Sequence, residues 1–527
     1  MPKPGIILSI FLLFFSSCKT DRHDQQDALI NFDQVPVEGG LVAGVPGKEG
    51  KVHVFKGIPY AAAPVGELRW KAPAPVKAWE GVKKCDIFAA SAMQPSPEPF
   101  YMWTEEFLIP KAPIDEDCLY LNIWTGAKTV DERRPVVVWV HGGGFTSGSG
   151  SVPIYDGEAM AEKGVVFVNI NYRLGILGFF AHPELTRESA GNASGNYGLM
   201  DQIAALKWVK NNITAFGGDP ENITIAGQSA GSVSVVFLVA SPLAKGLFQK
   251  AIAQSGAGLL SRTPGPESAA LLNLQQAEQA GMKVADELQA GSIARLRDIP
   301  AGELSKIRFP SHPIIDGYVL PESPARIFRE NKENEISLLT GWNEDDGIVI
   351  RGVEKAKAFE RSILTQWAAA GPELLGFYPA TNDSVAAIAQ KHLQRDIVFG
   401  AQNYTLANLV SSQGKAVYVY RFTREVPAGQ YEDFGAFHTA EVPYAYNNLK
   451  FMDRPFNPID YQLADLMSSF WVNFITSGNP NADGLPEWPE YHVQSREIMV
   501  LGAQQQKGMI RDTLSLNFLQ ERLMVEK

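Results

Sequence analysis

A pentapeptide with a serine at its centre lies between a β-branched run and an apolar, helix-forming stretch. Residues 223–225 read Ile-Thr-Ile, residues 227–231 read Gly-Gln-Ser-Ala-Gly, and valines and serines follow. The glycines two before and two after Ser229 allow a sharp strand–turn–helix bend with the hydroxyl at its apex. Such a serine can attack a carbonyl carbon, and amides at the helix start can bind the resulting oxyanion. Alone, the pattern is also compatible with a plain glycine and serine loop.

Apolar, β-branched runs alternate with segments of helical periodicity along most of the chain. This alternation predicts an α/β fold with a large, mostly parallel sheet that is covered by helices on both faces. The expected strands span residues 136–140, 165–171, 223–227, 251–254, 336–340 and 417–422, and the expected helices include residues 199–211 and 230–239. Residues 40–60 predict short antiparallel strands ahead of this sheet. We expect residues 31–525 to form a single domain, because large α/β enzymes reach this length with insertions.

Two stretches read as excursions from the sheet and its helices. Residues 94–113 are rich in proline and aromatic side chains. We expect them to wall a substrate cavity, because active sites of such folds lie on loops at the carboxyl ends of the strands. Residues 269–311 have helical character, and we expect plain packing there.

The amino-terminal residues have the order of an export signal. Lys3 is followed by the apolar residues 6–15, which are too few to span a bilayer, and then by small residues before Cys18. This order resembles a bacterial lipobox, in which residues 1–17 are removed and Cys18 carries the lipid. An ordinary secretory signal is the alternative. Both predict an exported protein, and in the lipoprotein the polar tether 18–30 and its lipid anchor are the only expected contact with a membrane.

Composition limits the partners and cross-links of the mature chain. The net charge is −11 and no basic block occurs, which argues against nucleic acid as a partner. Cys85 and Cys118 remain after removal of the signal, and an oxidising compartment favours a disulfide between them. Two separate buried thiols are the alternative. Neither cysteine has metal-ligand spacing with a histidine, so no metal is predicted.

A glycine run supplies a candidate oxyanion hole. The strand expected at 136–140 runs directly into residues 141–145, which read His-Gly-Gly-Gly-Phe. Consecutive glycines let backbone N–H groups face a developing negative charge without obstruction by side chains. The partner amide is expected from Ala230, the residue after the serine.

Two later loops can supply the base and its orienting carboxylate. Residues 341–347 follow an expected strand and contain three adjacent carboxylates, and residues 435–441 contain His438. A serine needs a base to take its proton, and this order of serine, acid and histidine is the one found with a nucleophile elbow. Of the eight histidines, we predict His438 as the base.

These motifs resemble the type B carboxylesterase family, which includes cholinesterases, bile-salt-type lipases and bacterial para-nitrobenzyl esterases. The matching segments are residues 55–61, 68–70, 116–124, 141–145, 171–175, 216–220 and 227–231. The resemblance covers nearly the whole mature chain. It implies an α/β-hydrolase fold without a metal or organic cofactor, and it implies structural ion pairs of Arg69 with Glu116 and of Arg173 with Asp201.

The resemblance also assigns roles to individual residues. It implies a catalytic triad of Ser229, Asp346 and His438 and oxyanion amides on Gly143, Gly144 and Ala230. The family usually has glutamate where this chain has Asp346, so Asp345 and Glu344 stay open as alternatives for the acid.

Substrate preference is expected to follow from the residues around the serine. The family usually has glutamate at the position of Gln228, and a neutral amide removes an attraction for cationic substrates. Phe145, Trp342 and Phe399 are expected to line a substrate pocket with Gln228, although they could equally be core aromatics.

The sequence therefore predicts a carboxylic-ester hydrolase that acts through an acyl-enzyme on neutral small or aromatic esters. Amidase or lactonase activity by the same triad is one alternative. A non-catalytic, cholinesterase-like surface binding protein is the other, although all triad residue types are present.

Overall fold

The computed structural model describes residues 1–2, 29–264, 271–349 and 352–524. Its main sheet has 11 strands in the order β16-β15-β14-β13-β12-β11-β9-β10-β8-β4-β3. The seven strands from β15 to β10 run parallel, and antiparallel strands flank them at both sides. The expected Cys18 lipidation site lies outside the described residues.

The strands of the main sheet are β3 (Val45–Pro46), β4 (His53–Pro59), β8 (Tyr120–Thr125), β9 (Arg134–Val140), β10 (Val166–Ile170), β11 (Gly218–Gln228), β12 (Lys250–Gln254), β13 (Ser337–Asn343), β14 (Val417–Phe422), β15 (Glu497–Leu501) and β16 (Gln505–Met509). A small sheet holds β1 (Val35–Val37), β2 (Gly40–Ala43) and β5 (Val82–Lys84), and β6 (Ser91–Ala92) pairs with β7 (Ile114–Asp115).

The helices are α1 (Glu158–Glu162), α2 (Gly175–Phe179), α3 (Pro183–Glu188), α4 (Tyr197–Asn212), α5 (Ala230–Ala240), α6 (Leu274–Glu287), α7 (Ile293–Asp298), α8 (Ala301–Leu304), α9 (Pro324–Arg329), α10 (Ala356–Trp367), α11 (Gly371–Phe377), α12 (Asp383–Arg395), α13 (Ala401–Ser412), α14 (Val442–Ala445), α15 (Pro458–Ser477) and α16 (Thr513–Leu523). A π-helical turn, Asp396–Gly400, joins α12 to α13.

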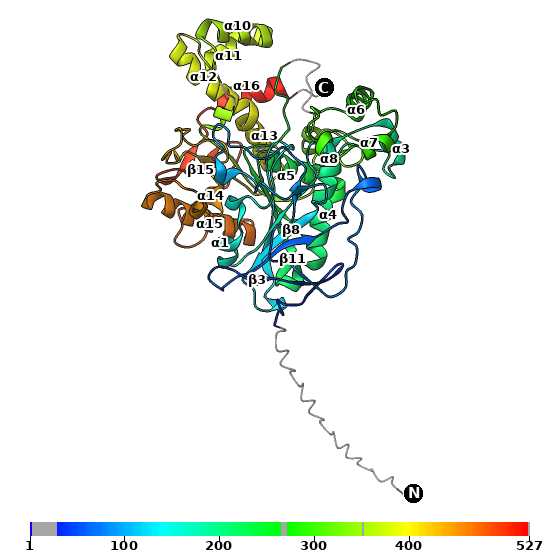
Figure 1. Ribbon diagram of the computed structural model, residues 1–527. Helices are drawn as coiled ribbons and strands as arrows, with labels where there is room; N and C mark the ends of the chain where they lie inside the picture. The colour runs from blue at the N-terminus through cyan, green and yellow to red at the C-terminus, as the bar shows by residue number, and fades with distance from the viewer. Residues whose placement is uncertain (3–28, 265–270, 350–351, 525–527) are drawn as a thin grey trace.

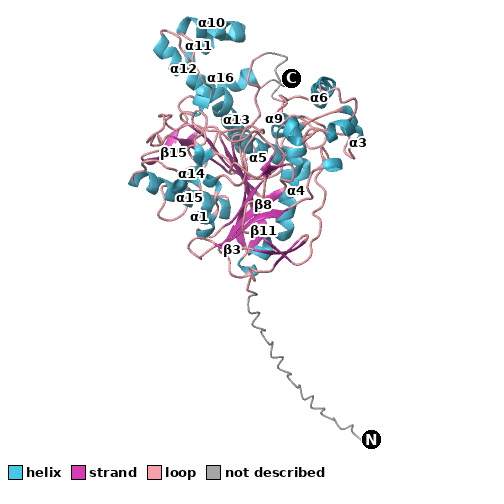
Figure 2. Ribbon diagram, in the orientation of Figure 1, coloured by secondary structure: helices cyan, strands magenta, loops and turns pink. Residues whose placement is uncertain are grey.

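The central strands are buried on both faces, as β9 illustrates. Val136, Val138 and Val140 belong to the core that includes α4, α5 and α13, whereas Val137 and Trp139 belong to the core that includes α15. Successive side chains of a strand point to opposite faces, so an unbroken apolar run suits a sheet with helices on both sides. Figure 2 shows helices on either side of the strands, and the predicted fold class is confirmed.

The predicted strands all form, and β11 and β13 extend furthest beyond their expected bounds. β11 begins at Gly218, because this residue pairs with Arg134 of β9. β13 continues to Asn343, and its Trp342 pairs with Arg421 of β14. The residues before the carboxylate cluster are therefore part of the sheet and not of the loop.

Residues 274–304 of the 269–311 stretch form α6, α7 and α8, which pack with α2 as the prediction of plain packing requires. Leu271 and Ser311, toward the two ends of the stretch, line a cavity instead. The ion pair of Arg69 with Glu116 is linked to α7, because Arg69 also donates hydrogen bonds to the carbonyls of Arg297 and Ile299 at 2.9 and 2.6 Å. The pair of Arg173 with Asp201 is fully buried, with 2.6 Å between Nη2 and Oδ1.

The predicted disulfide between Cys85 and Cys118 is wrong, because both thiols are free and buried. Cys85 is held by backbone hydrogen bonds to Ala43 and Lys56, and both cysteines pack in the main core. Burial raises the pKa of the Cys85 thiol to about 12. A free cysteine behaves as a small apolar side chain in such a core, and the compartment argument contained no information about the distance between the two.

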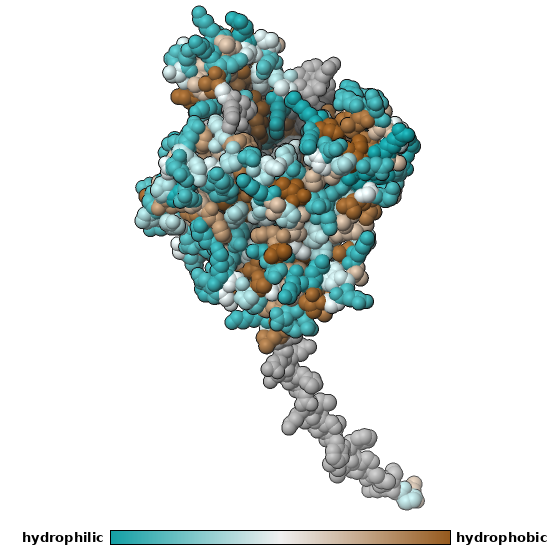
Figure 3. Space-filling view, in the orientation of Figure 1, coloured by the Kyte–Doolittle hydropathy of each residue, from teal (hydrophilic) through white to brown (hydrophobic). Residues whose placement is uncertain are grey.

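The surface shown in Figure 3 is largely hydrophilic, with hydrophobic side chains scattered between the polar ones. In the part of the chain that the structure describes, no helix is long and apolar enough to cross a membrane.

Candidate active site

Ser229 stands at the turn between β11 and α5 with a φ of 58° and a ψ of −124°. This backbone conformation is strained for a residue with a Cβ atom. A Cβ on Gly227 would collide with Gly231, and a Cβ on Gly231 would collide with the carbonyl of Val140. The Ser229 N–H donates to the carbonyl of Gln254 at 2.9 Å. The turn therefore requires both glycines, and it presents the serine to a cavity.

The glycine loop after β9 faces the serine. Gly143 and Gly144 have φ values of 106° and 61°, which few residues with a side chain adopt. Within the described residues, the N–H groups of Gly143, Gly144 and Ala230 have no hydrogen-bond acceptor. Unpaired N–H groups beside a nucleophile are suited to bind an oxyanion.

His141 supports this loop from below. Its carbonyl accepts a hydrogen bond from the Tyr172 hydroxyl at 2.9 Å, and the two rings stack with centroids 4.5 Å apart. Burial lowers the pKa of His141 to about 4, so its ring is neutral at pH 7.

His438 and Asp346 form a buried pair. The Nδ1 atom of His438 lies 2.8 Å from Oδ1 of Asp346. The second oxygen of Asp346 accepts hydrogen bonds from the Ser255 hydroxyl at 2.9 Å and from the Asn343 N–H at 2.8 Å. Asp346 is fully buried. These contacts fix the carboxylate and orient the imidazole with Nδ1 toward it.

The two neighbouring carboxylates point elsewhere. Glu344 pairs with Arg395 and Arg421 at 2.9 and 3.0 Å. Burial acts to raise the pKa of Glu344, but the two arginines hold it below its usual range. Asp345 accepts a hydrogen bond from the N–H of Ala436 at 2.9 Å, and burial raises its pKa. The carboxylate that contacts the histidine is therefore that of Asp346, and the two alternative acids have other partners.

The other ring nitrogen of His438 contacts Gln228. The Gln228 amide nitrogen lies 3.1 Å from His438 Nε2, while no hydrogen bond between the described residues joins Ser229 Oγ to this ring. Phe399 stacks on the imidazole with centroids 4.3 Å apart, and Trp103 lies edge-on at 6.4 Å. Catalytic hydrogen bonds are often incomplete before substrate binds.

A further carboxylate, Glu441, lies in the same buried region. It is fully buried and accepts hydrogen bonds from Asn343 Nδ2 at 2.6 Å and from Gln254 Nε2 at 3.1 Å. Burial, and then the charge of Asp346, raise the pKa of Glu441 to about 7. Glu441 was not among the predicted site residues, although it follows His438 by three positions.

The cavity over Ser229 has two lobes. The first, which we call the aromatic lobe, has a volume of about 740 Å³ and is walled by residues 94–109 as predicted. The second, which we call the polar lobe, has a volume of about 520 Å³ and is lined by residues 255–263 and 311–313, among others. Ser229, Gly144, Phe399 and Arg262 belong to both lobes.

The predicted pocket residues divide into two groups. Phe145 lines the polar lobe, Gln228 lines the aromatic lobe, and Phe399 lines both. Trp342 does not reach the cavity: it is fully buried in β13, with the Arg421 guanidinium 5.0 Å from its ring centroid. It is a core aromatic because β13 extends past it.

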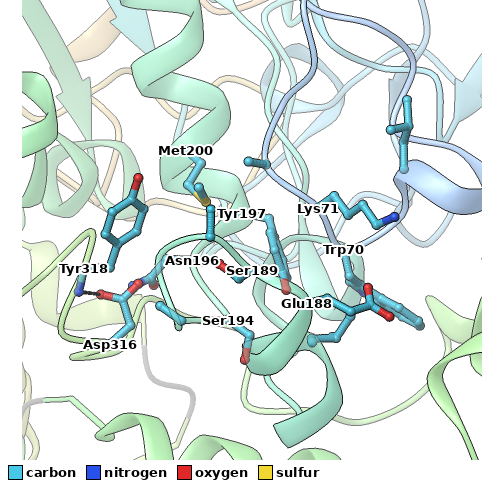
Figure 4. Close-up of a pocket in the computed structure, with 15 residues that line it drawn as sticks. Trp70, Lys71, Glu188, Ser189, Ser194, Asn196, Tyr197, Met200, Asp316 and Tyr318 are labelled. Carbon is cyan, nitrogen blue, oxygen red and sulfur yellow. Dashed lines mark hydrogen bonds between the residues drawn. The ribbon is translucent and has the colours of Figure 1, made fainter.

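A separate cavity of about 230 Å³ lies beside α3 and α4 (Figure 4). Its carboxylates are already engaged. Glu188 pairs with Arg297 at 2.7 Å, and Asp316 accepts hydrogen bonds from the N–H groups of Tyr318 and Leu320. None of its lining residues belongs to the cavity over Ser229. In the described ranges, no group of three or more histidine, cysteine or acidic side chains could hold a metal ion.

The comparisons with known proteins agree with this geometry. The profile of the Carboxylesterase family matches residues 30–519. The chain is 37% identical over 495 residues to the fumonisin B1 esterase of Sphingopyxis macrogoltabida, covering 89% of this chain and 86% of that protein. It is 35% identical to the para-nitrobenzyl esterase of Bacillus subtilis, covering 89% and 95%. A solved PNB esterase structure superposes with a TM-score of 0.80 at 32% identity, covering 93% of this chain and 99% of that one.

Proposed function

The chain belongs to the carboxylesterase family and is a carboxylic-ester hydrolase, and we propose that Ser229 is its nucleophile. His438 takes the proton of the Ser229 hydroxyl as the oxygen attacks the ester carbonyl, and Asp346 stabilises the imidazolium that forms. The distance of 2.8 Å between His438 Nδ1 and Asp346 Oδ1 is the observation that carries this proposal. In this step His438 Nε2 gives up its contact with the Gln228 amide and accepts a hydrogen bond from the Ser229 hydroxyl.

The tetrahedral intermediate is stabilised by the N–H groups of Gly143, Gly144 and Ala230. Their lack of any other acceptor in the described structure supports this role, because donors that are already in place need no reorganisation as charge develops. His438 then protonates the leaving alcohol. Water repeats the sequence on the acyl-enzyme, and the acid is released with Ser229 restored.

The substrates that this site favours have an uncharged reacting part of small or aromatic character. The contact of Gln228 with His438 supports this, because the amide adds no negative charge that would attract a cationic leaving group. The walls of Phe100, Trp103 and Phe107 in the aromatic lobe support it as well, because such side chains favour apolar or aromatic groups.

Replacement of the nucleophile tests the proposal. We expect Ser229→Ala to lower kcat for p-nitrophenyl butyrate by roughly 10⁴- to 10⁶-fold and to abolish labelling by a fluorophosphonate probe. The matched control is Ser412→Ala, which removes the hydroxyl of an exposed serine at the end of α13, outside the cavity lining, and this variant should still label. A Ser229→Ala protein that shows a burst of p-nitrophenol would refute the assignment.

A further inference from the structure

Arg262 stands where the two lobes of the active-site cavity meet. It lines both the aromatic and the polar lobe, and it also lines a groove toward α10 and α12. It lies between Ser261, whose N–H donates to the carbonyl of Leu523 at 3.0 Å, and Thr263, whose carbonyl accepts from the Ser261 hydroxyl. These contacts hold the backbone of this short segment at the mouth of the cavity.

Within the described residues, no hydrogen bond, ion pair or ring contact involves the guanidinium of Arg262. The nearby arginines of the carboxylate cluster differ in this respect. Arg395 pairs with Glu344 and Asp512 at 2.9 Å each, and Arg421 pairs with Glu344 at 3.0 Å. An arginine carries five donors and stays charged, so an unpaired one facing a cavity is a site for an anion.

The charge balance of the cavity points the same way. No carboxylate belongs to the described lining of the polar lobe. In the aromatic lobe, Glu98 is the only acidic residue of the described lining, and it is exposed. The lowered pKa of Arg262, which results from desolvation alone, is consistent with the absence of an acidic neighbour. Among the described residues, Arg262 therefore lines both lobes without an acidic partner, and the carboxylate of Glu354 belongs only to the groove toward α10 and α12.

We propose that Arg262 binds a carboxylate carried by the substrate, and that half-esters of dicarboxylic or polycarboxylic acids are preferred over neutral esters of the same length. This inference rests on the proposed function and narrows it: the ester group and the atoms next to it are uncharged, whereas the far end of the acyl chain carries the negative charge. A guanidinium binds a carboxylate through two parallel N–H···O bonds, which also sets the orientation of the chain over Ser229.

A matched pair of substrates tests this inference. We expect the wild-type protein to hydrolyse mono-p-nitrophenyl adipate with a kcat/KM about ten- to a hundredfold higher than that for p-nitrophenyl hexanoate. In Arg262→Gln this ratio should fall close to that set by chain length alone, and in Arg262→Lys it should be intermediate, because the charge stays and the bidentate geometry is lost. Raising the salt concentration should lower the ratio in the wild-type protein.

Arg187→Gln is the control, because it makes the same change of charge on an exposed position of α3 that does not line the cavity. Its selectivity ratio should equal that of the wild-type protein. The inference is overturned if the wild-type protein shows no preference for the adipate, or if Arg262→Gln keeps the preference. If the wild-type protein hydrolyses neither ester, the proposed function fails and this inference fails with it.

Discussion

The region behind His438 and the cavity in front of Ser229 differ in how their polar groups are satisfied. Behind the histidine, Asp346 and Glu441 are fully buried, and both accept hydrogen bonds from side chains or backbone fixed by the sheet. In front of the serine, the walls come from loops, and Arg262 lines the cavity with no partner in the part of the chain that the structure describes. The sheet thus fixes the catalytic groups of the site, whereas the loops leave groups free to recognise a substrate.

Among changes behind the histidine, we expect the largest loss of activity from Asp346→Asn. The amide keeps the shape but favours the wrong tautomer of His438 and no longer stabilises the imidazolium, so we expect kcat to fall by about 10⁴-fold. Steady-state kinetics with p-nitrophenyl butyrate would measure this. Asp345→Asn is the control, because its carboxylate contacts the Ala436 N–H and not the histidine. An equal loss in both variants would contradict the assignment of the acid.

A second test of the region behind the histidine is Glu441→Gln, which replaces the titrating carboxyl group of Glu441 by a neutral amide. The folded-state pKa is about 7 and thus above the ordinary value of 4.5. Between these two values the unfolded chain has lost the proton and the folded protein still holds it. Raising the pH through this window therefore lowers the free energy of unfolding, by about 3 kcal/mol in total. Above pH 7 this contribution stays constant.

The glutamine variant cannot lose this proton. Its free energy of unfolding relative to the wild-type protein should therefore rise from pH 5 to pH 8. Denaturant unfolding of both proteins at the two pH values would measure the difference. Parallel changes with pH in the two proteins would show that Glu441 does not titrate in this window.

We expect the smallest change in activity from a substitution in the loop that walls the aromatic lobe. Trp103→Ala removes an aromatic surface beside His438, and we expect kcat/KM for p-nitrobenzyl acetate to fall about tenfold, with a change of less than about threefold for ethyl acetate. The control Tyr461→Ala removes an exposed aromatic of α15 that lies outside the cavity lining. Equal losses for both esters would mean that Trp103 supports the site without selecting its substrate.

The region that could be predicted from the sequence is the one built on strands. Ser229 and His438 each follow a recognisable strand, and the glycines of the turn and of the oxyanion loop have a steric reason that is visible in the sequence. The resemblance predicts Asp346 as the acid, but a run of three adjacent carboxylates does not by itself distinguish it from Asp345 and Glu344. The structure does, because β13 ends at Asn343 and only Asp346 contacts the histidine.

The remaining errors and omissions concern distances between segments. The sequence pattern ends the strand before Trp342, whereas β13 includes this residue and keeps it away from the pocket. Cys85 and Cys118 are the only cysteines after the expected signal, yet both thiols are free. No sequence motif marks Arg262, because nothing in its neighbouring residues distinguishes it from the other lysines and arginines among the 47 of the chain. Its significance depends on which carboxylates lie near it in space.

The edges of the main sheet bear on how this enzyme behaves in concentrated solution. β3 has two residues and ends at Pro46, which has no N–H to offer to another strand. At the opposite edge, β16 carries Gln505, Gln506 and Lys507, whose ammonium pairs with Glu487 at 2.7 Å. Short, proline-ended or polar edge strands discourage pairing with a second chain. The sheet is thereby shielded from edge-to-edge aggregation at both ends.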